Sequence, residues 1–125
     1  MDSETLSIYL EEANELLEKM ERGIAQLESN FNDQDAIQSI FLSLHTLKGN
    51  TGFAGLETEF KIFSCFTDFF RPIHGKKENA TPKTIEMLKK FLPIIKKVIE
   101  QIKNGVSMEE AKASEIIQNL GLTLA

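Results

Sequence analysis

Apolar residues recur at alternating steps of three and four along most of this chain, which is the spacing of one face of an α-helix. The first stripe predicts a helix that is capped by Asp2 or Ser3 and ends near Phe31. Its inward residues are Leu6, Leu10, Ala13, Leu17, Met20, Ile24 and Leu27. No segment alternates apolar and polar residues as a half-buried strand would.

Two more stripes follow in the middle of the chain. A second helix is expected after the cap offered by Asn32-Asp33, and its inward residues are Ile37, Ile40, Leu44, Leu47 and Thr51. A third helix should begin near Leu56-Glu57 and end at Arg71-Pro72, because proline disfavours the helical conformation of the preceding residue. The polar stretch 72–79 is then expected to be a loop.

Thr81-Pro82 is a cap followed by proline at the first helical position, which predicts the start of a fourth helix. Its inward residues are Ile85, Leu88, Leu92, Ile95, Ile99 and Ile102. Pro93 lies inside this run, but the stripe keeps its phase, so one kinked helix is expected. The S-x-x-E capping box at 107–110 predicts a short fifth helix that Gly121 closes.

Four long helices with short connections predict an all-α fold, an antiparallel up-down four-helix bundle over residues 1–105. Residues 106–125 should add the short fifth C-terminal helix, either packed on the bundle or leading into a linker. Residues 1–35 carry a net charge of −8 and residues 76–103 a net charge of +5. This opposite charge favours the first and fourth helices as neighbours, although two separately solvated faces would give the same pattern.

The composition narrows the class of protein. A chain of 125 residues with 42% apolar residues suits one domain that buries its own core. Cys65 is the single cysteine, which excludes an internal disulfide and suits a reducing compartment. No stretch approaches the roughly 18 to 20 apolar residues of a membrane span, and the acidic N-terminus is unlike a secretory signal. A net charge of −5 argues against nucleic-acid binding, and we expect a cytoplasmic protein.

Side-chain sets for enzyme or metal chemistry are scarce. The two histidines and the one cysteine match no zinc signature, and no glycine loop for nucleotide phosphates is present, so no metal or cofactor is expected. His74 lies in the expected loop and is interpreted as a surface residue. Cys65 lies among phenylalanines and is interpreted as a buried, inert thiol.

His45 has a different setting. It lies about 100° around its helix from the inward Leu44, so its ring meets solvent at the edge of the apolar stripe. Lys48 is one turn further on, where its ammonium can neutralise an anion carried on the imidazole. Gly49 and Gly52 share this face and leave clearance for a partner surface. This is the setting of a phosphate-accepting histidine; the alternative is a helix-edge histidine with an accidental lysine neighbour.

The string Leu44-His45-Thr46-Leu47-Lys48-Gly49-Asn50 resembles the H-[ST]-[IL]-K-G signature of histidine phosphotransfer (HPt) domains, and residues 52–56 continue the pattern. The segment Tyr9–Leu17 resembles the first helix of the HPt domain that begins CheA-type chemotaxis kinases. The resemblance implies that His45 takes the ATP γ-phosphoryl group from a histidine kinase catalytic domain and passes it to an aspartate of a response regulator receiver domain.

The same resemblance implies roles for the neighbours of His45. Lys48 would be the cation beside the phosphoryl group, and Gly49 and Gly52 would let the partners approach. ATP and Mg²⁺ would belong to the partners, so the isolated domain would be a phosphocarrier and not an enzyme. The resemblance also suggests a monomer, whereas it is the charge and the apolar pattern that predict binding to neither nucleic acid nor membrane.

One feature departs from the family pattern. CheA-type domains usually carry a glutamate on the third helix that holds the other ring nitrogen of the histidine, with a second histidine one turn before it. The ungapped positions here are Thr67 and Ser64. Asp68 is adjacent, and a small rotation of the helix would let its carboxylate orient the imidazole instead.

Five of the nine phenylalanines fall between residues 60 and 70. Most are expected in the core, where burial of each is worth roughly 1.5–3 kcal/mol. Phe66 and Phe69 cannot easily share one face with the others, so one of them is a candidate docking contact near His45. Phe41, one turn before His45, is a second candidate.

Three functions are compatible with these residues. The chain is the first domain of a chemotaxis sensor kinase, a free-standing phosphorelay protein, or a helical interaction module whose histidine is never phosphorylated. The missing glutamate favours the third function. Acid-labile, base-stable phosphate on His45 would separate the first two from the third.

Overall fold

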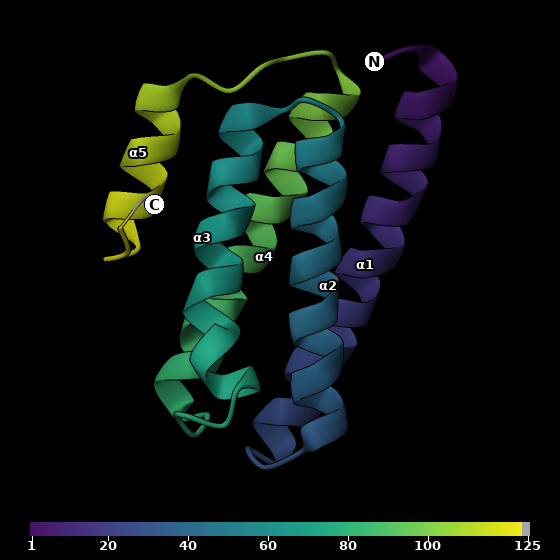
Figure 1. Cartoon of the computed structure of the whole chain (residues 1–125). Coiled ribbons are helices and arrows are strands. Elements are labelled where there is room, and N and C mark those ends of the chain that lie inside the picture. The colour runs from purple at the N-terminus through teal and green to yellow at the C-terminus, as the bar shows by residue number, and fades with distance from the viewer. Residues whose placement is uncertain (124–125) are drawn as a thin grey trace.

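The computed structural model describes residues 1–123, which form five helices and contain no strand. The helices are α1 (Ser3–Ser29), α2 (Gln34–Phe53), α3 (Glu57–His74), α4 (Pro82–Lys103) and α5 (Glu110–Asn119). The four long helices run up and down in turn, and α5 lies on the outside of α3 (Figure 1). The all-α bundle with a short fifth helix is therefore confirmed; residues 124 and 125 of the expected C-terminal segment lie outside the described residues.

Single side chains cap the starts of α1, α2 and α4, whereas α3 begins without a side-chain cap. The side chains of Asp2 and Asp33 each accept the backbone N–H three residues further on, at 2.7 and 3.0 Å. Thr81 caps α4 through a capping box. Pro93 lies inside α4, which runs as one helix, as the unbroken phase of its apolar stripe predicts.

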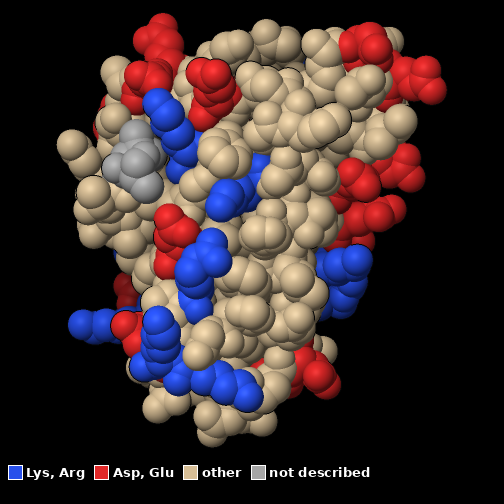
Figure 2. Space-filling view, in the orientation of Figure 1, with Lys and Arg blue, Asp and Glu red and all other residues tan. Residues whose placement is uncertain are grey.

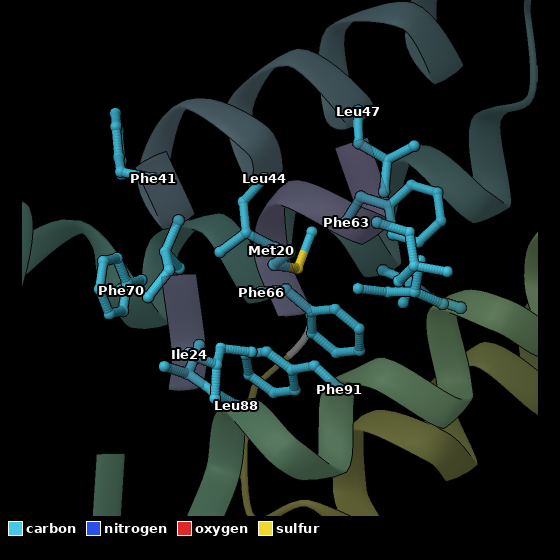
Figure 3. Close-up of a cluster of buried hydrophobic side chains, with 14 of the residues drawn as sticks. Met20, Ile24, Phe41, Leu44, Leu47, Phe63, Phe66, Phe70, Leu88 and Phe91 are labelled. Carbon is cyan, nitrogen blue, oxygen red and sulfur yellow. The ribbon is translucent and has the colours of Figure 1, made fainter. Parts of the chain in front are cut away.

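The inward stripes of the long helices meet in one core (Figure 3). Side chains with no exposed surface include Met20, Leu27, Ile40, Leu44, Leu47, Leu88 and Ile95. Between α1 and α2 the backbones approach closely at Gly23, where an added Cβ would lie 2.8 Å from Cγ1 of Ile40. None of the helices in residues 1–123 has an apolar stretch long enough to span a bilayer.

Phenylalanines fill the space between α3 and α4. The rings of Phe66 and Phe91 stack with centroids 3.9 Å apart, and Phe69 meets the edge of Phe91 at 5.4 Å. These large side chains bridge two helices whose backbones approach each other less closely than those of α2 and α3 do. Phe66 is therefore a core residue and Phe69 a partly buried one, both on the α4 side, and neither is the docking contact near His45 considered for them from the sequence.

Helices α1 and α4 lie side by side, and their opposite charges meet. Lys89 pairs with Glu28 at 2.8 Å, and Lys96 pairs with Glu21 at 3.8 Å. The side chains are about half exposed, so each pair stabilises the fold only modestly. The neighbour relation inferred from net charge is confirmed.

The predicted end of α3 is wrong. The helix continues through Pro72 to His74 instead of ending at Arg71-Pro72. Proline disfavours the helical state of the preceding residue but does not forbid it, and packing holds the extra turn in place. Ile73 is 4% exposed, and the ring of His74 stacks on Phe41 of α2 with centroids 3.9 Å apart.

The predicted start of α5 is also wrong. The capping box at 107–110 does not form, and the helix begins at Glu110 without a side-chain cap. The reason is a competing contact from α3. The backbone N–H of Met108 donates to the carboxylate of Glu59 at 3.2 Å, and Glu59 is only 4% exposed. Lys61 adds an ion pair with Glu110 at 2.6 Å, so α5 packs on α3.

Tyr9 provides a prediction about stability. Its hydroxyl lies 2.7 Å from that of Thr51, and burial raises the pKa of Tyr9 above its ordinary value of 10.0. Because the unfolded chain gives up this proton first, the stabilising contribution is present below pH 10 and is lost as the pH rises above it. We expect Tyr9→Phe to lower the free energy of unfolding by about 1 kcal/mol at pH 7, and by less above pH 10.

Urea unfolding of wild type and Tyr9→Phe on both sides of pH 10 measures this difference. Tyr9 is the single tyrosine, so the comparison isolates its titration from that of the lysines, which both proteins share. If the difference in the free energy of unfolding between the two proteins became larger as the pH rises, the result would contradict the burial of the tyrosine.

Candidate functional site

His45 lies in the middle of α2 with its side chain exposed to solvent. The buried Leu44 and Leu47 on either side fix the rotation of the helix about its axis. Within residues 1–123, no protein group forms a hydrogen bond or an ion pair with the imidazole. The ring is therefore available for chemistry directed by a partner, as the sequence predicts.

The aromatic ring of Phe41 stacks with the rings of both His45 and His74. Its ring is 5.8 Å from the His45 ring and 3.9 Å from the His74 ring, between centroids, and both pairs are stacked. A ring nitrogen of His74 lies 2.7 Å from the side-chain oxygen of Gln38, a hydrogen bond between α3 and α2. The guanidinium of Arg71 lies over Phe41 at 5.5 Å from the ring centroid.

The structure differs from the sequence-based expectations for Phe41 and His74. Phe41 is only 7% exposed, so its ring supports the site from below and does not offer the docking contact expected of it. His74 is not in a polar loop but belongs to the last turn of α3, where it links α3 to α2. Sequence reasoning missed this cluster because it ended α3 before His74.

Lys48 lies one turn after His45 on the same helix and is partly buried. Its ammonium is 5.8 Å from the centroid of the Phe60 ring on α3. This contact lies within the range of a cation–π interaction and holds the charge against α3, one turn along α2 from His45. Its role as the cation that meets an anion on the imidazole stays a prediction.

The two glycines near His45 differ in what surrounds them. An added Cβ at Gly49 would have no atom within 4 Å, so this position is open. An added Cβ at Gly52 would lie 2.8 Å from the Phe60 ring. Gly52 therefore makes room for the Phe60 ring of α3; it is also exposed, and its role as clearance for a partner stays a prediction.

The third-helix positions that replace the family's glutamate and second histidine do not orient His45 in this structure. The hydroxyl of Thr67 donates to the carbonyl of Phe63 at 2.7 Å and has no exposed surface. The hydroxyl of Ser64 is buried and has no hydrogen-bond partner among residues 1–123.

Asp68 is exposed on α3 and makes no hydrogen bond to His45 within residues 1–123. Its carboxylate pairs with Arg71 at 3.5 Å. It also contributes, after burial, to raising the pKa of the Cys65 thiol, which lies on the outer side of α3. The structure shows the carboxylate engaged with Arg71 and not with the imidazole, and the orienting role considered for Asp68 stays a prediction.

A groove between α1 and α2 runs beside the site and was missed from the sequence. Its volume is about 630 Å³, and its lining includes Glu12, Glu15, Asp35, Leu16, Leu42 and Thr46. Acidic side chains gather on the side of the molecule formed by α1 (Figure 2). No group of three or more potential metal ligands occurs within residues 1–123.

The fold and the site define a class of protein, a helical bundle that presents one solvent-exposed histidine from the middle of its second helix. Residues 4–105 match the Hpt domain family, and the chain belongs to that family. The match covers all four long helices with His45 and Lys48.

The chain is similar to larger chemotaxis proteins. It is 30% identical over 98 residues, 78% of its length, to the chemotaxis protein CheA of Borreliella burgdorferi, and covers 11% of that protein. It is 25% identical over 114 residues, 90% of its length, to the sensor histidine kinase CheAY of Helicobacter pylori, and covers 14% of it. The chain thus spans a small part of these relatives.

Two solved structures share the fold. The CheA phosphotransferase domain of Thermotoga maritima superposes with a TM-score of 0.74 at 22% identity, over 82% of this chain and 97% of that one. The phosphorylated P1 domain of CheA3 from R. sphaeroides, in complex with CheY6, superposes with a TM-score of 0.85 at 16% identity, over 96% and 94%.

Proposed function

We propose that this domain is a phosphocarrier of chemotaxis signalling. His45 takes a phosphoryl group from ATP bound to a histidine kinase catalytic domain and passes it to an aspartate of a response regulator receiver domain. The observation that carries the proposal is the setting of His45, an exposed imidazole within a family-matched signature, with Lys48 beside it and open space above Gly49.

The transfer steps balance with the groups that this site supplies. The ring nitrogen with the lone pair attacks the γ-phosphorus, the N–P bond forms, and the bond from phosphorus to the β,γ-bridging oxygen breaks. ADP leaves with that electron pair, and the imidazole proton is released to solvent. In the second step the receiver carboxylate forms an O–P bond, and the ring nitrogen recovers its electron pair.

The residues of this domain prepare the acceptor and leave the catalysis to the partners. Burial of Leu44 and Leu47 turns His45 outward, so the kinase and the receiver can reach the same nitrogen in turn. Lys48 offsets the negative charge that arrives with the phosphoryl group. ATP and Mg²⁺ belong to the partner domains, and ATP is the substrate that supplies the phosphoryl group.

We further propose that the chain is one domain of a larger sensor kinase of the CheA type. The support is its similarity to CheA proteins, of which it spans between 11% and 16%. On this proposal the donor domain belongs to the same protein, and the receiver is a separate response regulator. The R. sphaeroides complex is a pair of this kind, a phosphorylated P1 domain with CheY6.

The proposal is tested with a CheA-type catalytic domain, radiolabelled ATP and Mg²⁺. Wild type should take up label that is lost in acid and stable in base, and a receiver domain with its own Mg²⁺ should remove it. His45→Gln should take up no label. His74→Gln is the matched control, because it changes the second histidine and should leave a labelled protein. Label on His45→Gln at the wild-type level would overturn the proposal.

The Gly49→Ala variant distinguishes the effect of this residue on the free energy of unfolding from its effect on the approach of partners to His45. The position is helical and open, so alanine should raise the free energy of unfolding by up to about 1 kcal/mol. The added methyl group lies on the face that the partners approach, so transfer should slow. Gly23→Ala is the contrasting variant, because overpacking against Ile40 should cost about 1–3 kcal/mol, more than the gain in helix propensity.

Urea unfolding and the transfer assay, run on the same preparations, check both expectations. A Gly49→Ala protein that is more stable and transfers at the wild-type rate would show that partners do not approach over this residue.

A further inference from the structure

We propose that Arg71 of α3 is a second cation that binds the phosphoryl group on His45, opposite Lys48. The inference rests on the proposed function of His45 and extends it to a residue outside the signature. Four observations support it: the face of α3 on which Arg71 lies, its level along the bundle, its contact with Phe41, and its exposed ion pair with Asp68.

Arg71 lies on the face of α3 that meets α2. Phe60 marks that face, because its ring contacts the backbone of α2 at Gly52. At about 100° per residue, Arg71 lies only about 20° around the helix from Phe60, and Asp68 lies about 80° from it. The cation, and not the carboxylate, therefore lies along the α2 side of α3.

Arg71 also lies at a suitable level along the helices. Gly52 lies against Phe60, and Phe41, eleven residues before Gly52, lies against Arg71, eleven residues after Phe60. This register of the antiparallel pair places His45 about one turn from the level of Arg71.

Side chains on an α-helix lean toward the N-terminus of their own helix. Because α2 and α3 run in opposite directions, the side chain of His45 leans toward the level of Arg71, and that of Arg71 leans toward the level of His45. Lys48 lies on the other side of His45, one turn further along α2, with its ammonium against Phe60. The two cations therefore flank the space in which a phosphoryl group on His45 would lie.

Phe41 connects the two groups. Its ring centroid lies 5.8 Å from that of His45 and 5.5 Å from the guanidinium carbon of Arg71. The ring is buried and fixed by its stack with His74, so it offers a rigid surface for the guanidinium. The guanidinium can keep this contact while its N–H groups turn to an anion beside the ring.

Asp68 holds Arg71 loosely in the free protein. The pair is 3.5 Å long, and its side chains are 51% and 52% exposed, so water screens it and little free energy is lost when it opens. A phosphoryl group carries more negative charge than a carboxylate and more acceptor oxygens. Arg71 would therefore exchange Asp68 for the phosphoryl group when His45 is modified, with no bond made or broken in the exchange.

This arrangement gives Asp68 a different role from the one considered from the sequence. It acts on the arginine and not on the imidazole. The site then contains two cations and no carboxylate that contacts His45, so the free energy of the phosphorylated form depends on Lys48 and Arg71 together.

The test uses potassium phosphoramidate as the phosphoryl donor, so that no partner protein docks. The histidine nitrogen forms the N–P bond and the donor releases ammonia. The fraction phosphorylated at a fixed donor concentration, read by ³¹P NMR, should give an equilibrium constant about tenfold lower for Arg71→Gln than for wild type. Arg71→Lys should recover part of this loss, and Arg22→Gln on α1 is the control that should match wild type.

Asp68→Asn distinguishes a direct role of the arginine from a structural one. Removal of the competing carboxylate should leave phosphorylation equal to or greater than wild type, whereas an indirect role through the ion pair predicts the same loss as Arg71→Gln. Equal phosphorylation of wild type and Arg71→Gln would overturn this inference and leave the proposed function intact. Absence of phosphate on wild-type His45 with both phosphoramidate and the kinase would overturn both.

Discussion

Replacement of Phe66 by alanine is expected to lower the free energy of unfolding by about 3–5 kcal/mol. Phe66 has no exposed surface, and its ring stacks on Phe91 at 3.9 Å and tilts against Phe63 at 6.5 Å. It fills the gap between α3 and α4, whose backbones approach each other less closely than those of α2 and α3 do. A domain of this size has a free energy of unfolding of about 5–15 kcal/mol, so this single substitution should remove a large part of it.

Chemical unfolding measures this effect, and the chain provides a matched substitution. Phe53 is 97% exposed at the end of α2, so Phe53→Ala should change the free energy of unfolding by less than about 0.5 kcal/mol. A Phe66→Ala protein that unfolds at the wild-type urea concentration would show that α3 and α4 do not pack through these rings.

Removal of the Lys48 ammonium is expected to have the second large effect, on transfer and not on stability. Lys48→Ala should lower the rate of phosphorylation by the kinase domain by about tenfold to a hundredfold, because one charge-assisted contact with the phosphoryl group is lost. Its contact with Phe60 at 5.8 Å is exposed to solvent on one side, so unfolding should change little.

Lys61 provides the control for this prediction. It is also a lysine of this region, but it lies on α3 and pairs with Glu110 at 2.6 Å, on the side covered by α5. Lys61→Ala should phosphorylate at the wild-type rate. Similar rates for wild type and Lys48→Ala would remove the lysine from the transfer step.

The fold could be predicted largely from apolar spacing, because each stripe identifies the face of a helix that must be buried. The starts of α1 and α2 could be predicted from the capping residues Asp2 and Asp33. Their side chains accept hydrogen bonds from backbone groups close to them in sequence. The prediction failed where contacts between residues far apart in the sequence determine where a helix begins or ends. Stacking on Phe41 extends α3 to His74, and the buried carboxylate of Glu59 displaces the capping box of α5.

The candidate site was predicted to a similar extent. His45, Lys48 and Gly49 lie on one helix, so their spacing alone brings them together. The contributions of α3 could not be predicted, because they depend on the register of α2 against α3. That register places Phe60 over Gly52 and Arg71 over Phe41. The signal available in sequence was weak, since Arg71 lies next to a proline that suggested the end of the helix.

The central claim is that His45 carries the phosphoryl group. The most direct measurement is to phosphorylate the wild-type domain with a CheA-type catalytic domain and to map the modified residue by mass spectrometry at neutral to basic pH. A phosphocarrier role for His45 predicts one phosphoryl group, on His45, that disappears when a receiver domain is added. A phosphoryl group on His74, on a serine or on a threonine, with His45 unmodified, would contradict it.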